Sequence, residues 1–382
     1  MEKPDCNMEN TALTQSELQR YARHLSLPGF GLQAQLKLKQ SRVLVIGAGG
    51  LGSPVLMYLA AAGVGRITII DFDQVEQSNL QRQILYSANE QGASKAVAAA
   101  ARIRALNPEI LVESRQEPFS RENARQLIRA HDLVVDGTDN FPTRYLSNDA
   151  CVLEGKPLIY GSIYRFEGQV SVFNLQRPDG SRGPNYRDLF PTPPPPELVP
   201  NCAEGGVIGV LPGIIGSMQA NEAIKVLSGT GMPLDGKLYV LDAGSMLSRT
   251  INIRKNPDIQ ITELIDYEQF CNPAGRYQPP AVSVQELQEW RQQGSDFQLI
   301  DVREPSEYEI ANLGGQLRPL ADLEQWAPEY AKTQRLVLHC RSGQRSARAV
   351  KQLQEMGYQQ VFNLEGGLLA WAKEIDPGLP AY

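Results

Sequence analysis

The stretch RVLVIGAGGLG, from Arg42 to Gly52, decides the fold of the first part of this chain. Its opening residues are the β-branched and apolar residues of a buried strand, and four glycines follow within six positions. A glycine-rich turn between a strand and a helix lets the backbone approach phosphate oxygens, to which the helix N-terminus presents amide donors. The residues expected in this phosphate loop are Gly47, Gly49, Gly50 and Gly52.

Strands and helices alternate outward from this loop. A predicted helix over Ser53–Ala62 leads to the strand RITIID (Arg66–Asp71), and an alanine-rich helix over Ala93–Ala105 precedes the strand LVVDGTD (Leu133–Asp139). This alternation predicts a mostly parallel sheet with helices on both faces. From Pro157 two strand-like runs follow one another directly, which predicts an antiparallel extension. The predicted fold class is therefore α/β, Rossmann-like, with a small second α/β unit near the C-terminus.

The length of 382 residues suggests two domains. We expect a domain with the phosphate loop over 1–270, a linker over 271–281 rich in proline and glycine, and a second domain over 282–382. The segment Gln15–Leu36 is expected to be helical and carries basic residues, including Arg23.

The composition excludes several classes of protein. A net charge of -6 gives no basic surface for nucleic acid, and no apolar run is long enough for a membrane span. The polar N-terminus lacks the pattern of a secretory signal, so a cytoplasmic location is expected. The five scattered cysteines predict free thiols rather than a disulfide framework.

Polar side chains after the strands favour triphosphate chemistry over hydride transfer. The phosphate loop followed by Asp71, which suits ribose hydroxyls, fits an NAD-binding domain equally well. Asn79, Arg82 and Lys95 follow, and Asp139 ends a later strand. Cations that neutralise phosphates and a carboxylate that holds Mg²⁺ serve an ATP site, whereas a dehydrogenase gains little from them. An NAD-dependent oxidoreductase with a regulatory second domain remains the alternative enzyme.

Five sequence motifs carry a resemblance to a known family: RYARH, GAGGLG, DFDQVEQSNLQRQ, ASKA and DGTDN. Together they resemble the ubiquitin-activating-like family, most closely the molybdopterin-synthase adenylyltransferase (MoeB) and ThiF type, over Leu13–Cys271. The resemblance implies ATP and Mg²⁺ as cofactors, ribose binding by Asp71, and phosphate contacts by Asn79, Arg82 and Lys95. The substrate it implies is the C-terminal Gly-Gly of a ubiquitin-like sulfur carrier protein.

The same resemblance implies roles for residues elsewhere in the chain. Asp139, followed by Asn140, would position Mg²⁺ and the reacting centre. In a homodimer, Arg23 would reach into the ATP site of the other subunit. Cys202, in VPNCAEGG, would form a thioester or acyl disulfide with the carrier, although a partly buried structural cysteine is an equal alternative.

The sequence departs from this family at its structural zinc site. Relatives usually carry two Cys-x-x-Cys pairs. The corresponding positions here are Asn185 and Asp188, then Ile259 and Thr262. Because three neutral groups and one carboxylate make a poor zinc site, we expect no structural zinc.

A second candidate site lies at Cys340. The run RLVLHC predicts a buried strand that ends at this cysteine, and RSGQRS leads into a helix beginning near Ser346. Turn amides, the helix dipole and two arginines would favour a thiolate or a persulfide. With LIDVRE and LEGGLLAW, the segment Val282–Leu379 resembles a single rhodanese domain, which implies that Cys340 carries the persulfide. The persulfide loop comprises Arg341, Ser342, Gly343, Gln344 and Arg345.

The two sites together predict an adenylyltransferase and sulfurtransferase. The first domain would adenylate the carrier's C-terminal glycine, and the persulfide would then give a thiocarboxylate. Molybdopterin (molybdenum cofactor) biosynthesis is the expected pathway, with thiamine biosynthesis or tRNA thiolation as alternatives, and a cysteine desulfurase is the expected sulfur donor. A non-catalytic scaffold that binds only nucleotide and carrier is the alternative from another class.

Overall fold

The computed structural model describes residues 12–193, 206–271 and 278–380. The chain divides into two compact units, Met1–Pro273 and Ala274–Tyr382, which we treat separately. Among the described residues, no helix is both long and apolar enough to cross a membrane.

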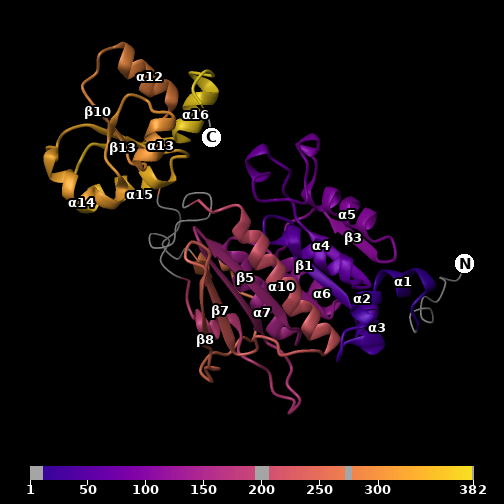
Figure 1. The fold of residues 1–382 in the computed structure, drawn as a ribbon. Helices are drawn as coiled ribbons and strands as arrows, with labels where there is room; N and C mark the ends of the chain where they lie inside the picture. The colour runs from indigo at the N-terminus through magenta and orange to yellow at the C-terminus, as the bar shows by residue number, and fades with distance from the viewer. Residues whose placement is uncertain (1–11, 194–205, 272–277, 381–382) are drawn as a thin grey trace, which may run out of the picture. The chain divides into compact units, whose positions relative to one another are not determined.

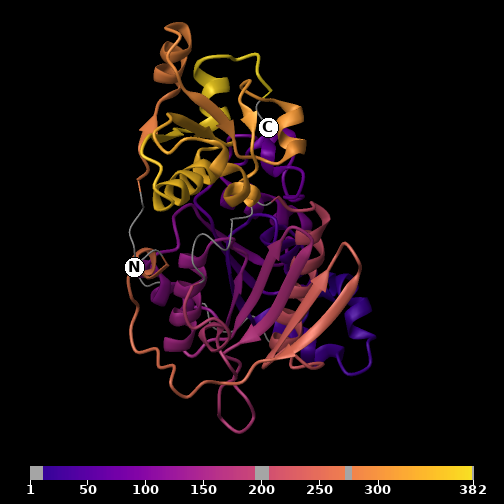
Figure 2. The same ribbon diagram turned by 90° about the vertical axis from the view of Figure 1, so that its left-hand side faces the viewer.

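The first unit is built on one eight-stranded sheet in the order β3-β2-β1-β4-β5-β6-β7-β8. The strands from β3 to β5 in this order pair in parallel, and the strands from β5 to β8 pair in antiparallel, as predicted (Figure 2). The strands are β1 (Arg42–Ile46), β2 (Arg66–Ile70), β3 (Leu111–Arg115), β4 (Leu133–Asp136), β5 (Leu158–Tyr164), β6 (Glu167–Phe173), β7 (Lys237–Asp242) and β8 (Leu247–Asn252).

Helices cover both faces of this sheet (Figure 1). Alternate residues of β1 explain why two layers form, because Val43 and Val45 enter one core and Leu44 and Ile46 enter the other. The helices are α1 (Gln15–Arg20), α2 (Ala22–Leu25), α3 (Gly31–Gln40), α4 (Gly52–Ala62), α5 (Lys95–Leu106), α6 (Arg121–Arg129), α7 (Phe141–Leu153), α8 (Tyr186–Leu189), α10 (Val210–Ser228) and α11 (Tyr267–Cys271).

The N-terminal segment corrects one expectation. The expectation that Gln15–Leu36 is helical is met only in part, because α1, α2 and α3 are separate helices and residues 26–30 lie between α2 and α3. Pro28 lacks an amide donor, and Gly29 has a φ of 80°. Neither residue continues a helix in this conformation, and Arg23 lies on the short helix α2 that ends before them.

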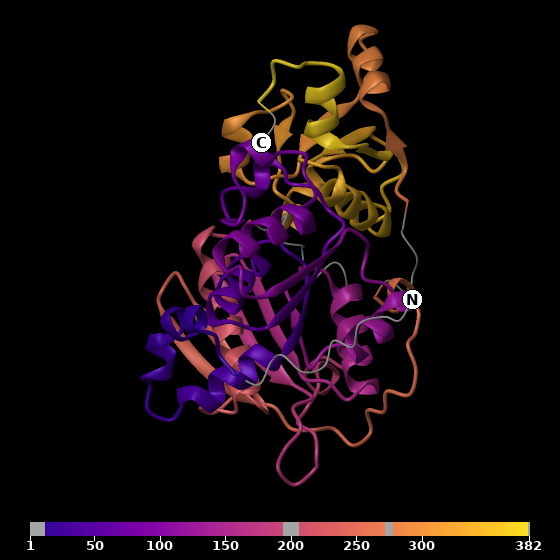
Figure 3. The same ribbon diagram turned by 90° about the vertical axis from the view of Figure 1, so that its right-hand side faces the viewer.

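The second unit has a five-stranded, fully parallel sheet in the order β11-β10-β12-β13-β9. Buried apolar residues form a core on each face, and Figure 3 shows helices beside these strands. Its strands are β9 (Ala281–Val282), β10 (Gln298–Asp301), β11 (Gln316–Leu317), β12 (Leu336–His339) and β13 (Val361–Leu364). Its helices are α12 (Val284–Gln292), α13 (Pro305–Ile310), α14 (Leu323–Trp326), α15 (Gln344–Glu355) and α16 (Gly367–Glu374).

Candidate nucleotide and sulfur-transfer sites

A cavity of about 440 Å³ opens at the carboxyl ends of the parallel strands of the first unit. The turn between β1 and α4 forms one wall, where Gly47, Gly49 and Gly50 line the cavity. Gly47 has a φ of 87°, and a Cβ on Gly52 would lie 2.1 Å from the Gly47 carbonyl oxygen. The turn therefore requires glycine at both positions, which leaves its backbone open to a ligand.

Asp71 ties the phosphate loop to the end of β2. Its carboxylate accepts hydrogen bonds from the Ala48 amide at 2.8 Å and from the Asp73 amide at 2.9 Å. Burial raises the pKa of Asp71, and these two amides oppose the rise. The carboxylate lines the cavity beside the turn, where it is placed to meet a ribose.

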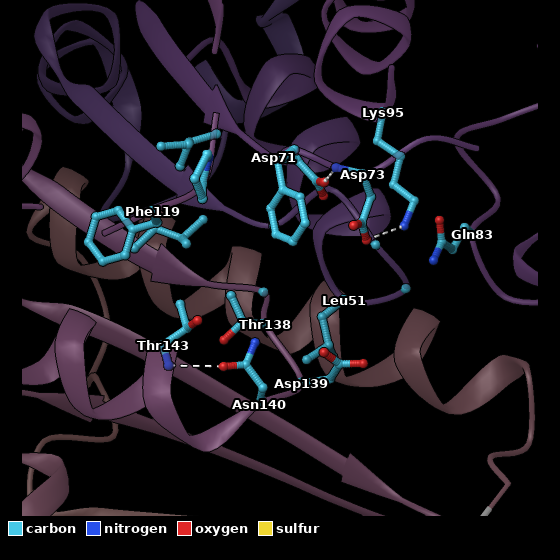
Figure 4. A pocket seen from close by; sticks show the side chains of 18 of the residues that line it. Leu51, Asp71, Asp73, Gln83, Lys95, Phe119, Thr138, Asp139, Asn140 and Thr143 are labelled. Carbon is cyan, nitrogen blue, oxygen red and sulfur yellow. Dashed lines mark hydrogen bonds and ion pairs between the residues drawn. The ribbon is translucent and has the colours of Figure 1, made fainter. Parts of the chain in front are cut away.

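Cationic side chains line one end of the cavity. The Lys95 ammonium is almost buried and pairs with the Asp73 carboxylate at 2.9 Å (Figure 4). Arg82 and Gln83 also line the cavity, and Arg82 donates to the Ser78 carbonyl at 3.0 Å. Figure 4 shows Lys95 and Gln83 at the opposite end from the Phe119 ring. Phosphates therefore fit near Lys95, and a nucleobase fits near Phe119.

Asp139 and Asn140 lie on the turn after β4, and both line the cavity. The Asn140 side chain accepts a hydrogen bond from the Thr143 amide at 2.9 Å and so caps α7 (Figure 4). The Asp139 carboxylate is exposed. Protein sites for Mg²⁺ commonly supply one or two carboxylates and leave the rest to phosphates and water, so Asp139 fits that ion. No group of three or more potential metal-binding side chains gathers anywhere in the described residues.

Three predicted residues lie outside this cavity or outside the described chain. Asn79 is buried in the turn before Arg82, where its side chain accepts a long hydrogen bond from the Glu76 amide at 3.4 Å. Arg23 is exposed on α2 and does not line the cavity of its own chain. Cys202 lies outside the described residues.

The second candidate site surrounds Cys340, at the carboxyl end of β12. The Gly343 amide donates to the Cys340 sulfur at 3.2 Å, and the Ser346 hydroxyl lies 3.5 Å from it. Helix α15 begins at Gln344, two residues before the predicted start. Cys340 itself is 1% exposed. The loop thus encloses the sulfur and directs amide and hydroxyl donors toward it.

Glycines of the LEGG segment pack against this loop. Gly366 and Gly367 both have positive φ angles, and a Cβ on Gly367 would lie 2.4 Å from the Cys340 carbonyl oxygen. The Leu368 amide donates to that oxygen at 3.0 Å. The start of α16 therefore fixes the backbone on which the cysteine sits.

Arg345 does not act on the sulfur as an isolated charge. Its guanidinium forms a two-pronged ion pair with Glu307 of α13, with both N···O distances at 2.6 Å. Arg345 lowers the pKa of Glu307, although burial opposes this effect. The sequence prediction counted the positive charge of Arg345 and missed Glu307, which balances it.

The donor set at the family's zinc position does not fit zinc. Ile259 has no atom that could bind a metal. The Asp188 carboxylate already accepts three hydrogen bonds, from the Asn185 backbone amide at 2.7 Å, the Asn185 side chain at 2.8 Å and the Asn256 backbone amide at 2.8 Å. Hydrogen bonds of Asp188 therefore join α8 to the turn at Asn256, where relatives are expected to use a metal.

Each of the two units matches a known protein family. The family model described as "ThiF family" matches residues 21–261, more than half of the chain. The chain belongs to the ThiF family. The model described as "Rhodanese-like domain" matches residues 283–374.

Full-length relatives of this ThiF-family chain carry both units. The probable adenylyltransferase/sulfurtransferase MoeZ of Mycobacterium tuberculosis is 48% identical over 381 residues, which cover 97% of each protein. The adenylyltransferase and sulfurtransferase MOCS3 of Drosophila sechellia is 43% identical over 98% of this chain and 87% of the relative. This ThiF-family member is accordingly an adenylyltransferase and sulfurtransferase.

Two further comparisons concern the first unit. The sulfur carrier protein adenylyltransferase of Thermus thermophilus is 52% identical over 265 residues, which cover 68% of this chain and 98% of the relative. The crystal structure of E. coli MccB with ATP matches with a TM-score of 0.53 at 21% identity, over 63% of this chain and 74% of that one. At that identity the structural match shows only a shared fold, and it agrees with the predicted fold class.

Proposed function

We propose that the chain adenylates the C-terminal glycine of a ubiquitin-like sulfur carrier protein and then transfers sulfur to it. The observation that carries the first step is the single cavity that brings together the glycine turn, Lys95, Arg82 and Asp139. The relative from Thermus thermophilus, named as a sulfur carrier protein adenylyltransferase, supports this substrate class.

In the adenylation step, a carboxylate oxygen of the carrier attacks the α-phosphorus of ATP. The bond from that phosphorus to the bridging oxygen breaks, and pyrophosphate leaves with the electron pair. Lys95 and Arg82 bind the negative phosphates, and the glycine turn supplies amide donors. Mg²⁺ would be held by Asp139 together with phosphate oxygens and would neutralise charge on the phosphates. The chain's contribution is positioning and charge neutralisation.

In the sulfur step, the terminal sulfur of a Cys340 persulfide attacks the activated acyl carbon and displaces AMP. The product is an acyl disulfide between the carrier and Cys340. A second thiolate then attacks the Cys340 sulfur, which releases the thiocarboxylate and leaves a disulfide between Cys340 and that thiol, to be reduced by an external thiol before the next cycle. Cys202 is our candidate for the second thiolate. The Gly343 amide and the Ser346 hydroxyl at the Cys340 sulfur support the persulfide role, because both donate to an anion.

The remaining partners follow from the same chemistry. A cysteine desulfurase would load Cys340, and molybdopterin biosynthesis is the pathway that we favour. A homodimer would let Arg23, exposed on α2, complete the ATP site of a second subunit. ATP–pyrophosphate exchange by the variant Arg23→Ala, mixed with an excess of a Lys95→Met variant, tests this arrangement, because complementation requires sites shared between subunits.

The decisive experiment is mass spectrometry of candidate carriers that end in Gly-Gly, after incubation with the enzyme, Mg-ATP and a persulfide donor. Replacement of one oxygen by sulfur on a single carrier is the expected result, and it also identifies the pathway. ATP–pyrophosphate exchange without a mass change of the carrier would support the adenylation step and contradict the sulfur-transfer step. With competent carriers, failure of both reactions would favour a non-catalytic scaffold.

A further inference from the structure

Two buried charged side chains, which no step above uses, hold the residue before Asp139. Asp136, at the end of β4, accepts hydrogen bonds from the Thr138 amide at 2.9 Å and from the Thr138 hydroxyl at 2.6 Å. Arg144, on α7, donates to the Thr138 carbonyl oxygen at 3.1 Å. Asp136 and Arg144 are 0% and 7% exposed. Thr138 is therefore held through its amide, its hydroxyl and its carbonyl at once.

Both residues are in turn held by neighbouring elements of the first unit. The Asp136 carbonyl oxygen accepts a hydrogen bond from the side chain of Gln219, on α10, at 2.7 Å. Arg144 also donates to the Ser162 hydroxyl, on β5, at 2.9 Å, and its guanidinium lies over the Tyr160 ring. The turn that carries Asp139 is thus connected to β4, β5, α7 and α10 rather than to solvent.

Burial of these charges has a free-energy cost. Burial raises the pKa of Asp136, and the nearby Arg144 charge opposes that rise. A turn that needed only stability would gain as much from apolar packing, because buried opposite charges commonly bring no net stability over apolar groups. What the charges provide is a fixed direction for the three Thr138 hydrogen bonds, and hence for the carboxylate that follows.

We propose that Asp136 and Arg144 are positioning residues for adenylation. They hold the Thr138 peptide so that the Asp139 carboxylate projects into the nucleotide cavity at one fixed place. This inference rests on the role proposed above for Asp139 toward Mg-ATP. It predicts that loosening the hold lowers the rate of the chemical step and the contribution of Mg²⁺ to ATP binding, while the affinity for metal-free ATP stays unchanged.

The test compares two threonines of the first unit, Thr138 in the turn after β4 and Thr68 in β2. Thr138→Val removes the hydroxyl that donates to Asp136. Thr68→Val removes a buried hydroxyl on β2, which lies 2.8 Å from the His131 ring. We expect Thr138→Val to lower kcat of ATP–pyrophosphate exchange about tenfold and to raise KM for Mg-ATP, because the metal then contributes less to binding. Thr68→Val should keep kcat, although it removes the same chemical group from the same unit.

A second variant weakens the hydrogen bond to the carbonyl oxygen of Thr138. Arg144→Lys keeps the positive charge but lacks the planar fork that reaches both Ser162 and Thr138. We expect a loss in kcat comparable to that of Thr138→Val. The double variant should lose less than the product of the two single losses, because both changes loosen one hold. Independent, multiplicative losses would argue against a shared function.

A binding measurement separates this inference from the proposed function. Calorimetry of ATP with Mg²⁺ and with EDTA measures the gain in affinity that the metal provides. Thr138→Val should lose most of that gain, and Thr68→Val should retain it. Equal gains in the two variants, with equal kcat, would overturn the positioning role. If the wild type binds Mg-ATP but activates no carrier, the proposed function fails, and the calorimetry still decides the role of Asp136 and Arg144.

Discussion

Lys95 is an almost buried cation whose ion-pair partner can be replaced by the phosphates of a nucleotide. Its side chain is 7% exposed, and its partner Asp73 is about half exposed. An almost buried ammonium requires a counter-charge, and the triphosphate supplies a stronger one than a solvated carboxylate. The ion pair with Asp73 therefore satisfies Lys95 until ATP binds and does not compete strongly with it.

Replacement of Lys95 by methionine should raise KM for ATP by at least about tenfold, because one charged phosphate contact is lost. Lys39→Met is the matched control, since Lys39 is also nearly buried and forms an ion pair, with Glu17 at 2.7 Å, away from the cavity. The control should lose stability and keep KM. ATP–pyrophosphate exchange measured over a range of ATP concentrations checks both, and an unchanged KM in Lys95→Met would contradict the phosphate role.

Cys340→Ala should abolish sulfur transfer and leave ATP–pyrophosphate exchange intact, because the acyl-adenylate forms in the first unit. The control is Cys271→Ser. Burial raises the pKa of Cys271 to about 12, so this thiol stays protonated and unreactive near neutral pH. Thiocarboxylate formation and exchange are measured in parallel. Loss of exchange in Cys340→Ala would show that the two activities do not divide between the units as we infer.

Single site residues could be predicted where their position at the end of a strand or the start of a helix indicates on which edge of the sheet they lie. The glycine turn, Asp71, Lys95 and Asp139 follow strands or begin helices at one edge of a parallel sheet, and they do line one cavity. Glu307, which balances the charge of Arg345, was missed because the two residues are distant in sequence. Phe119 was missed for a similar reason. The prediction also passed over Asp73, Gln83 and Ser346, although they lie beside residues that it named.

Among the elements, the turn between β1 and α4 leaves no room for a side chain at Gly52. Gly52→Ala would place a methyl group against the Gly47 carbonyl, so we expect a cost of about 1–3 kcal/mol and a displaced phosphate loop with lower ATP affinity. Gly213→Ala, in α10, is the control, because a Cβ there meets no atom within 4 Å. The control should stabilise the protein slightly. Thermal unfolding with and without ATP distinguishes the two.

Whole elements were predictable where one physical pattern dominates. The buried strands among β1 to β6 are mainly apolar and β-branched. The segment that connects two successive strands, either a helix or a short turn, then determines whether they pair in parallel or antiparallel. The expected helical segment Gln15–Leu36 is interrupted at residues 26–30, where the backbone preferences of Pro28 and Gly29 break a helix. The hydrogen bonds of Asp188 with Asn256 were beyond prediction, because they join residues far apart in the sequence.

At the scale of the whole molecule, the departure at the zinc position predicts a fold that is stable without structural zinc. Elemental analysis of the purified protein should find no tightly held zinc, and EDTA should leave its thermal unfolding unchanged. One zinc per chain would contradict the prediction. Asp188→Ala should cost roughly 2 kcal/mol, because three donors lose their acceptor. Asp179→Ala, on an exposed turn, should change stability by no more than about 0.5 kcal/mol.

The Asp188 hydrogen bonds also bear on how the two activities coexist in one chain. Persulfides transfer sulfur to thiolates, and zinc-bound cysteines are thiolates held permanently deprotonated. A zinc cluster in the first unit would be a competing acceptor for the sulfur carried on Cys340, and each misplaced sulfur atom would weaken the metal site. Amide and carboxylate groups do not accept sulfur in this way. The hydrogen bonds of Asp188 thus stabilise the zinc position of the adenylation unit without thiolates that could accept the sulfur carried on Cys340.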